Sequence, residues 1–293
     1  MDKILEITSG KGGNAYLLAG GKQNALIDCG MAYCAQELIG KVRQALNDGS
    51  LDFIVISHSH YDHVGAIPYI KECWPECKVL GAEYAQKVLN IATALKAIRD
   101  LGEQAASIYG AKGIFPYDDS LLKVDQVIRE GDILDLGNMR IQVMETPGHT
   151  KCSLSFLVND DILFPSESTG YMSKSGRVYP AFITSGSEAL KSIQRCREMH
   201  PRVIYSPHYG LLNESDTQNY WENCEEAVLK TVEFVRRLAA QGMDEAAILI
   251  EYEKKFRDGQ SRLEQPFEAF RLNNAPMIKG VLREGCEETR VIR

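Results

Sequence analysis

The sequence of 293 residues predicts an α/β fold with a layered core and a helical extension at its C-terminal end. Between residues 16 and 90, short apolar β runs alternate with stretches whose apolar residues recur at helical spacing, as in strands covered by helices. Between residues 124 and 164, short β runs separated by turn sequences indicate an antiparallel meander. Only helical patterns follow residue 212, which predicts a catalytic domain over residues 1–212 and a helical cap over residues 213–293.

The predicted elements follow one another with few interruptions. Two β runs, residues 16–19 and 25–28, are joined by a Gly-Gly-Lys turn, which is typical of a hairpin. An amphipathic helix at residues 91–108 breaks the later alternation, and we expect either a pocket wall or a surface helix there. The other elements are helix 32–47, strand 53–56, helix 64–73, strand 78–80, helix 83–90, β runs 126–128, 133–136, 140–145, 153–158 and 162–164, helix 187–199, strand 203–205 and helices 220–241, 243–256 and 265–284.

A cluster of histidines directly follows the predicted strand 53–56. The chain has only six histidines, and His58, His60 and His63 fall in this one loop together with Asp62. In an extended segment His58 and His60 point the same way, whereas the turn into the next helix aims Asp62 and His63 at a second point. Clustered imidazoles would repel one another if protonated, so divalent cations explain them better than packing does. Helix capping by Asp62 would explain only one of the four residues.

Composition and charge exclude several classes of function. The chain is 44% hydrophobic and 25% charged, as in ordinary soluble proteins. Its net charge of −7 argues against nucleic acid or an anionic membrane as a partner. No signal-peptide pattern and no apolar stretch of the ~20 residues that span a bilayer are found, so we expect a cytoplasmic location. The eight cysteines include no Cys-x-x-Cys pair, which favours reduced, mostly buried thiols.

The run His58-x-His60-x-Asp62-His63 resembles the signature of the metallo-β-lactamase superfamily, a group of mostly hydrolytic metalloproteins. The resemblance implies an αβ/βα four-layer sandwich and three further metal ligands. Two of them match family turns: His149 lies in Thr-Pro-Gly-His-Thr, and His208 follows a β run in a Pro-His turn. The third, Glu167, stands where the family usually has an Asp that bridges two metals. Because Glu is one methylene longer, it could bridge, bind one metal or hydrogen-bond a ligand histidine.

Two other residues receive roles from this comparison. Asp28, after the opening hairpin, matches a family Asp that acts on the site indirectly. His200 is the only histidine left without a metal, and we expect it to cap the end of a helix. The helical tail and Tyr61 also resemble a subgroup that includes the alkylquinolone-response thioesterase, in which C-terminal helices cover the site.

The resemblance implies a dinuclear centre, with zinc expected and iron or manganese as alternatives. Two divalent ions would hold a hydroxide at neutral pH and polarise the bond under attack. Asp62 would orient this hydroxide, Tyr61 or Tyr209 would donate to the developing oxyanion, and Tyr171 is expected to pack on the rim. The assigned ligands are His58, His60 and His149 for one ion, Asp62, His63 and His208 for the other, and Glu167 as the bridge.

The predicted function is therefore a metal-dependent hydrolase that acts on a small ester, thioester, lactone or phosphoester. We expect a small-molecule substrate as its partner, neither nucleic acid nor a membrane, and a homodimer is an open alternative. Three other functions remain: a mononuclear oxidoreductase of the same fold, a di-iron oxidoreductase, which normally has a carboxylate where His60 stands, and a metal-containing regulator that acts through its helical surface.

Overall fold

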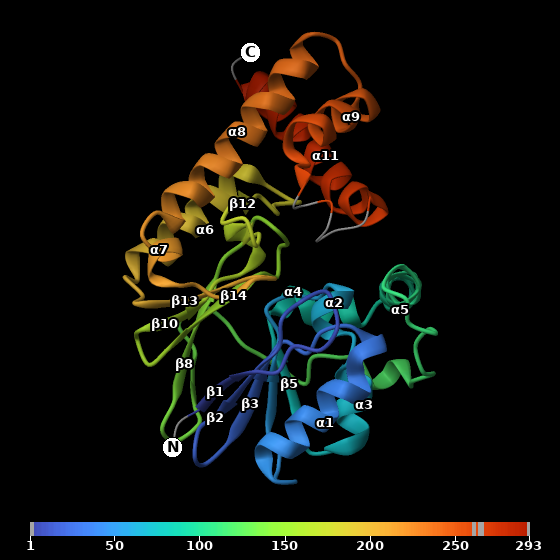
Figure 1. Cartoon of the computed structure of the whole chain (residues 1–293), viewed down its shortest axis with the longest axis vertical. Coiled ribbons are helices and arrows are strands. Elements are labelled where there is room, and N and C mark those ends of the chain that lie inside the picture. The colour runs from blue at the N-terminus through green and yellow to red at the C-terminus, as the bar shows by residue number, and fades with distance from the viewer. Residues whose placement is uncertain (1–2, 260–261, 263–266, 292–293) are drawn as a thin grey trace. The chain divides into compact units, whose positions relative to one another are not determined.

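The computed structural model in Figure 1 describes residues 3–259, 262 and 267–291 of the chain. The chain folds into two compact units. Unit 1 contains residues 1–145 and 154–163, and unit 2 contains residues 146–153 and 164–293. The predicted boundary at residue 213 follows a change of sequence pattern rather than this division, and it stays a prediction.

A six-stranded sheet with the order β1-β2-β3-β4-β5-β6 forms the centre of unit 1. β1, β2 and β3 are antiparallel to one another, whereas β3, β4, β5 and β6 are parallel. Its buried strand residues include Leu17, Leu26, Ile54 and Val79, which are all inaccessible to solvent. The strands are β1 (Lys3–Glu6), β2 (Tyr16–Ala19), β3 (Asn24–Ile27), β4 (Phe53–Val55), β5 (Lys78–Gly81) and β6 (Gln126–Val127).

Helices connect the parallel strands of this sheet, because a parallel pair needs a long crossover. α1 packs against α3, and Figure 1 shows both on one face of the sheet. The amphipathic helix predicted at residues 91–108 is α5, here called the insertion helix, and it packs against α2 and α4. These elements are η1 (Ala32–Cys34), α1 (Ala35–Leu46), α2 (Tyr61–Val64), α3 (Ile67–Cys73), α4 (Glu83–Leu89), α5 (Ala92–Ile108) and η2 (Asp119–Leu121).

Unit 1 also contains the predicted meander, in the order β10-β9-β8-β7. β7 pairs antiparallel with β8, and β8 with β9. The turn after β9 has Asn159 and Asp160 at φ 52° and 56°, as in the two-residue turns that match the twist of a hairpin. The strands are β7 (Ile133–Asp135), β8 (Arg140–Glu145), β9 (Leu154–Val158) and β10 (Ile162–Phe164).

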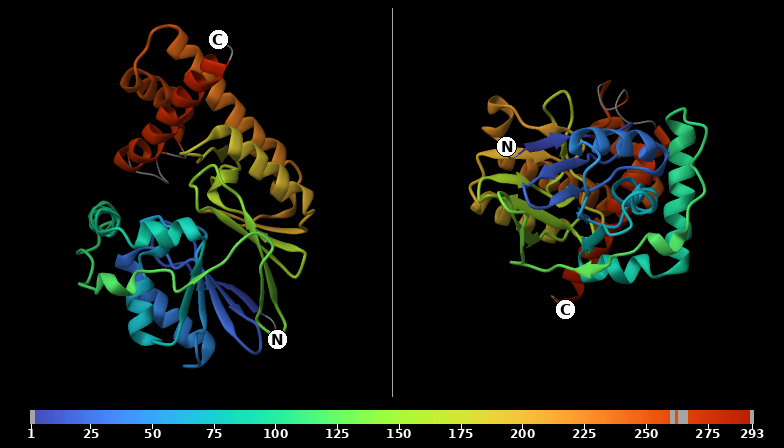
Figure 2. Two further views of the ribbon diagram at one scale, coloured as in Figure 1. Left: turned by 180° about the vertical axis from the view of Figure 1, so that it is seen from behind. Right: turned by 90° about the horizontal axis from the view of Figure 1, so that it is seen from below.

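Unit 2 is mainly helical, and its long helices pack against one another around α8. α6 packs on η3, α8 packs on α6 and on β12, and α9 and α11 pack on α8 and on each other. Figure 2 shows the helices of the extension from two further sides. The elements are η3 (Glu167–Thr169), β11 (Tyr171–Met172), β12 (Val178–Tyr179), α6 (Gly186–Glu198), β13 (Val203–Ser206), β14 (Gly210–Leu211), α7 (Glu214–Thr217), α8 (Tyr220–Ala240), α9 (Glu245–Phe256) and α11 (Phe267–Val291).

The structure confirms the predicted α/β fold and the C-terminal helical extension. Side chains cap the N-termini of α6 and α9. Ser185 accepts a hydrogen bond from the Glu188 amide, and Asp244 accepts one from the Ala247 amide. After α6, His200 adopts a left-handed conformation at φ 49°, where the helix ends. Over the part of the chain that the structure describes, no helix is both long and apolar enough to cross a membrane.

The cysteines that the structure describes form no disulfides with one another. Seven cysteines are free, and six of these are buried, while Cys73 is half-buried. The side chain of Cys286 lies outside the described residues.

Candidate metal centre

Three imidazoles meet in unit 1 directly after β4. The backbone of Ile56 still bonds to β5, and the chain then runs through an extended loop until α2 begins at Tyr61. His58 and His60 contact edge to face at a ring-centroid distance of 4.6 Å, and His63 on α2 lies 4.2 Å from His58. His58 and His63 are almost inaccessible to solvent, at 1% and 4%. The loop therefore gathers its three histidines as the sequence predicts.

Asp28 orients the ring of His63 directly and the ring of His58 through Ser57. It directly follows β3 and has a left-handed backbone conformation, with φ at 53°. Its Oδ1 accepts from the Ser57 amide at 2.7 Å, and its Oδ2 accepts from Ser57 Oγ at 2.6 Å and lies 2.7 Å from His63 Nδ1. Ser57 Oγ in turn lies 3.0 Å from His58 Nδ1. An oxygen at Nδ1 is the usual partner of a metal-binding histidine, because it sets the tautomer that leaves Nε2 as the ligand atom.

A glycine that the sequence analysis did not single out brings a loop close to the same ligands. A Cβ added at Gly13, between β1 and β2, would lie 2.4 Å from the Asp62 carbonyl oxygen and 2.9 Å from His63 Cε1. Only glycine permits this approach without a shift of one side. The signal in the sequence was the glycine-rich stretch of residues 10–13, but nothing in it says which side chain the stretch contacts.

Asp62 and Tyr61 both lie on α2, and their surroundings differ. Asp62 Oδ2 is 3.6 Å from His63 Nε2, so the carboxylate faces the ligand side of that ring. Tyr61 packs against a buried cluster of Met31, Cys34 and Ala105, the last of which lies on α5. Burial and the nearby negative charge of Asp62 raise the pKa of Tyr109, just beyond α5. The insertion helix thus packs against the helix that carries two candidate ligands.

In unit 2, the Thr-Pro-Gly-His-Thr turn is held by α6 and by the segment before it. A Cβ on Gly148 would lie 2.7 Å from the backbone of Ala189 on α6, and the glycine has φ 137°. The carbonyl of Gly148 accepts from the amides of Ile183, Thr184 and Ser185 at 3.0 to 3.2 Å. This turn therefore needs glycine both for its conformation and for its close packing.

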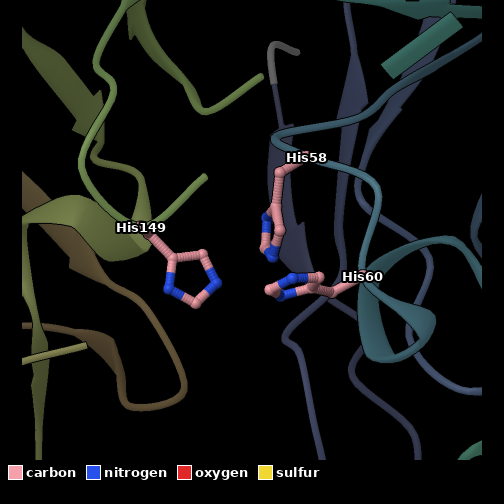
Figure 3. Close-up of side chains that lie close together, drawn as sticks. All are labelled: His58, His60 and His149. Atoms are coloured by element: carbon pink, nitrogen blue, oxygen red, sulfur yellow. The ribbon is translucent and has the colours of Figure 1, made fainter. Parts of the chain in front are cut away.

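The ring of His149 is oriented by the same segment. Its Nδ1 forms a hydrogen bond with the carbonyl of Ala181, and its amide donates to Ser168 Oγ at 2.9 Å. The pattern is the one found at His58 and His63, in which an oxygen holds Nδ1 and Nε2 is the ligand atom. Figure 3 shows the side chain of His149 on its turn, and those of His58 and His60 on the loop before α2.

Glu167 lies between two imidazoles of unit 2. Its Oε2 is 3.5 Å from His149 Nε2, and its Oε1 is 3.1 Å from His208 Nε2. It opens η3, where Ser166 Oγ accepts from the Ser168 amide, and Thr146 Oγ1 donates to Ser166 Oγ at 2.9 Å. The carboxylate is 9% exposed. Each of its oxygens therefore faces a different histidine, and the bridging role of Glu167 stays a prediction.

His208 occupies the tight turn between β13 and β14, where its φ is 58°. Its ring meets Tyr171 edge to face, with the centroids 5.8 Å apart. The hydroxyl of Tyr209 donates to Asp216 Oδ2 at 3.2 Å, toward α7. The roles predicted for Tyr61 and Tyr209 as donors to an oxyanion stay predictions.

The donor chemistry of the two units fits a divalent metal. Unit 1 supplies His58, His60, Asp62 and His63, and unit 2 supplies His149, Glu167 and His208. Each unit thus offers imidazoles and a carboxylate, a donor set that suits zinc, iron or manganese, whereas calcium and magnesium prefer sites made of oxygen ligands. Because three of the five rings have Nδ1 bound to an oxygen, their Nε2 atoms are the ligand atoms that the geometry favours.

Comparison with known proteins identifies the family of this chain. The family model of the metallo-beta-lactamase superfamily matches residues 8–208. ST1585, a metallo-beta-lactamase fold-containing protein of Sulfurisphaera tokodaii, is 30% identical over 210 residues, which are 68% of this chain and 73% of that protein. The solved structure of ST1585 from Sulfolobus tokodaii has a TM-score of 0.59 and 25% identity, and covers 79% of this chain and 87% of its own.

Two further proteins extend the comparison. The chain is similar to a hydroxyacylglutathione hydrolase of Legionella pneumophila, at 22% identity over 57% of this chain, and it spans 52% of that relative's length. The metallo-beta-lactamase family protein TTHA1429 of Thermus thermophilus shares the fold, with a TM-score of 0.59 at 18% identity, over 81% of this chain and 82% of its own. Since the family match includes all seven candidate ligands, the chain belongs to the metallo-β-lactamase superfamily.

Proposed function

We propose that the chain is a dinuclear metal-dependent hydrolase. In this proposal the ligands of units 1 and 2 combine: His58, His60 and His149 hold one ion, Asp62, His63 and His208 hold the other, and Glu167 bridges the two. The observation that carries it is the position of Glu167, because one of its oxygens faces His149 and the other faces His208. These two histidines belong to different ions in the proposal, so a carboxylate between them supports a bridging role for Glu167.

The protein's own residues would prepare the site for hydrolysis. When bound, the two ions supply a hydroxide at neutral pH and polarise the bond under attack. Asp28 and Ser57 hold the rings of His58 and His63, so that the ligand geometry is set before substrate arrives. Asp62, beside His63, offers a carboxylate that accepts a hydrogen bond and orients the attacking oxygen. No nucleophilic side chain is needed.

The substrate class is proposed from chemistry and from the relatives. Hydroxyacylglutathione is a thioester, and a similar protein is named for its hydrolysis. We therefore put a small thioester first, with carboxylic esters, lactones and phosphoesters as the other candidates. The net charge of −7 disfavours a large polyanion as substrate. Zinc is the first choice of metal, and a cytoplasmic location and a homodimer belong to the same proposal.

Turnover that depends on metal tests this function. We expect the protein as purified to hydrolyse at least one member of a panel of small thioesters, esters, lactones and phosphoesters. A chelator should abolish the activity, and zinc, iron or manganese should restore it. Hydrolysis that persists after complete metal removal would refute a metal-dependent mechanism. Metal-replete protein that hydrolyses nothing on the panel would move the regulatory alternative ahead.

A further inference from the structure

The hairpin formed by β11 and β12 begins two residues after η3, which carries Glu167. Tyr171 pairs with Tyr179 and Met172 with Val178. The ring of Tyr171 stacks on that of Tyr179 at 5.6 Å, and its other neighbour is His208 at 5.8 Å. Tyr171 is half-buried. An aromatic ring that retains access to solvent therefore lies directly beside a candidate metal ligand.

The end of α9 and the segment after it contact this hairpin. Asp258, which follows α9, accepts a hydrogen bond from the Tyr179 hydroxyl at 2.9 Å and lies 3.5 Å from Arg177 Nη1. The guanidinium of Arg177 lies over the rings of Tyr179 and Phe256, at 5.0 and 5.7 Å. The base of the hairpin is attached separately, since the Met172 amide donates to Ser206 Oγ at 3.2 Å.

A pocket lies beside the residues that bind Asp258. About 280 Å³ of space lies between the hairpin and α8, lined by Arg177, Tyr179, Asn223, Lys230 and Phe256, among others. Although α8 packs on β12, a space of this size leaves part of the hairpin without packing contacts on that side. The hydrogen bond to Asp258 and the stacking of Arg177 therefore add to the contacts that hold Tyr179, and Tyr179 in turn pairs with and stacks on Tyr171.

We propose that this hairpin determines substrate specificity, with Tyr171 contacting a planar, apolar group of the substrate while His208 binds metal. The inference rests on the proposed hydrolase function. Tyr179, Arg177 and Asp258 are positioning residues, through which the helical extension sets the place of the Tyr171 ring. A tyrosine face prefers a flat ring to an aliphatic chain, because stacked or edge-to-face aromatic pairs are more favourable than their buried area alone explains. The substrate class favoured is a thioester or ester of an aromatic acid.

Binding of carboxylic acids, the products of such a reaction, tests Tyr171 without requiring turnover. Calorimetric titration would compare phenylacetate with hexanoate, a somewhat smaller aliphatic acid, on zinc-loaded protein. We expect Tyr171→Ala to weaken phenylacetate by about three- to ten-fold and hexanoate by less, with the metal content unchanged. Equal losses for the two acids, or no loss for either, would overturn the proposal. If phenylacetate binds as expected but no ester is hydrolysed, the function fails and the inference about the ring stands.

Removal of the Tyr179 hydroxyl tests the attachment. Tyr179→Phe keeps the ring and loses the donor to Asp258, so we expect the preference for phenylacetate to fall two- to three-fold. Trypsin should also cut faster after Lys174, at the exposed tip of the hairpin. Tyr84→Phe, on an exposed residue of α4, is the matched control and should change neither quantity. Unchanged preference and unchanged cleavage in Tyr179→Phe would refute a role for the helical extension.

Discussion

Gly13→Ala is the substitution for which the structure predicts the clearest effect on the metal centre. The new Cβ would lie 2.4 Å from the Asp62 carbonyl oxygen, 2.9 Å from His63 Cε1 and 3.0 Å from His63 Nε2. These distances are ~0.5–1 Å inside ordinary van der Waals contact, so either the loop or α2 must move. A shift of this size at His63 is incompatible with its hydrogen bond of 2.7 Å to Asp28.

The expected magnitude follows from that displacement. Overpacking costs about 1–3 kcal/mol of stability, and a displacement of ~1 Å in an active site costs on the order of 10²-fold in rate. We therefore expect Gly13→Ala to remain folded, to retain less metal after dialysis, and to lose about 10²-fold in kcat/KM. Elemental analysis, ester or thioester hydrolysis and thermal unfolding measure the three effects.

A second glycine provides the control for this experiment. Gly40 lies on α1 with nothing within 4 Å of an added Cβ, so Gly40→Ala should leave the site intact. It should stabilise the helix by about 0.5–1 kcal/mol, because alanine loses less conformational entropy on folding. Normal metal content and activity in Gly13→Ala would show that the approach of the loop to His63 does not matter, and would refute the reasoning.

Three further predictions concern ligand orientation, metal removal and pH. Asp28→Asn removes the carboxylate that accepts from His63 Nδ1, so metal affinity measured by competition with a chelator should fall about 10- to 100-fold, and unchanged affinity would contradict this. Metal removal should lower Tm, and readdition should restore it, because the ions bind only the folded state. Burial raises the pKa of Cys77 from 9.0 to about 12, so the folded state keeps a proton that the unfolded chain loses. The contribution of Cys77 to the free energy of unfolding is constant below pH 9 and falls by at most ~1.4 kcal/mol per pH unit above it. The substitution Cys77→Ala should therefore make Tm less sensitive to alkaline pH.

The fold was predictable where the sequence has a clear period. Amphipathic spacing predicted helices at residues 32–47, 91–108 and 220–241, and the structure has α1, α5 and α8 there. The two-residue strands β11 and β12 have no period to detect, and β1 was not predicted either. These short elements depend on partners that are distant in sequence or on ties such as that of Met172 to Ser206.

The candidate ligands were predictable for a different reason, since histidine is rare in this chain and its positions fit known turns. What surrounds the ligands was not predictable in the same way. The contact of Gly13 with Asp62 and His63, and that of Asp258 with Tyr179, join segments that are dozens of residues apart. A local sequence pattern does not indicate which distant segment will lie against it. The resemblance to the thioesterase subgroup and the boundary at residue 213 stay predictions.

The most direct test of the central claim is the number and identity of metal ions in protein purified without added metal. Elemental analysis of the wild type should find about two divalent ions per chain, as a dinuclear centre requires. Glu167→Ala should retain about one, because the bridging carboxylate is lost, while Glu83→Gln on α4 should retain both as an exposed control. One ion or none in the wild type, with no dependence on Glu167, would contradict the dinuclear hydrolase.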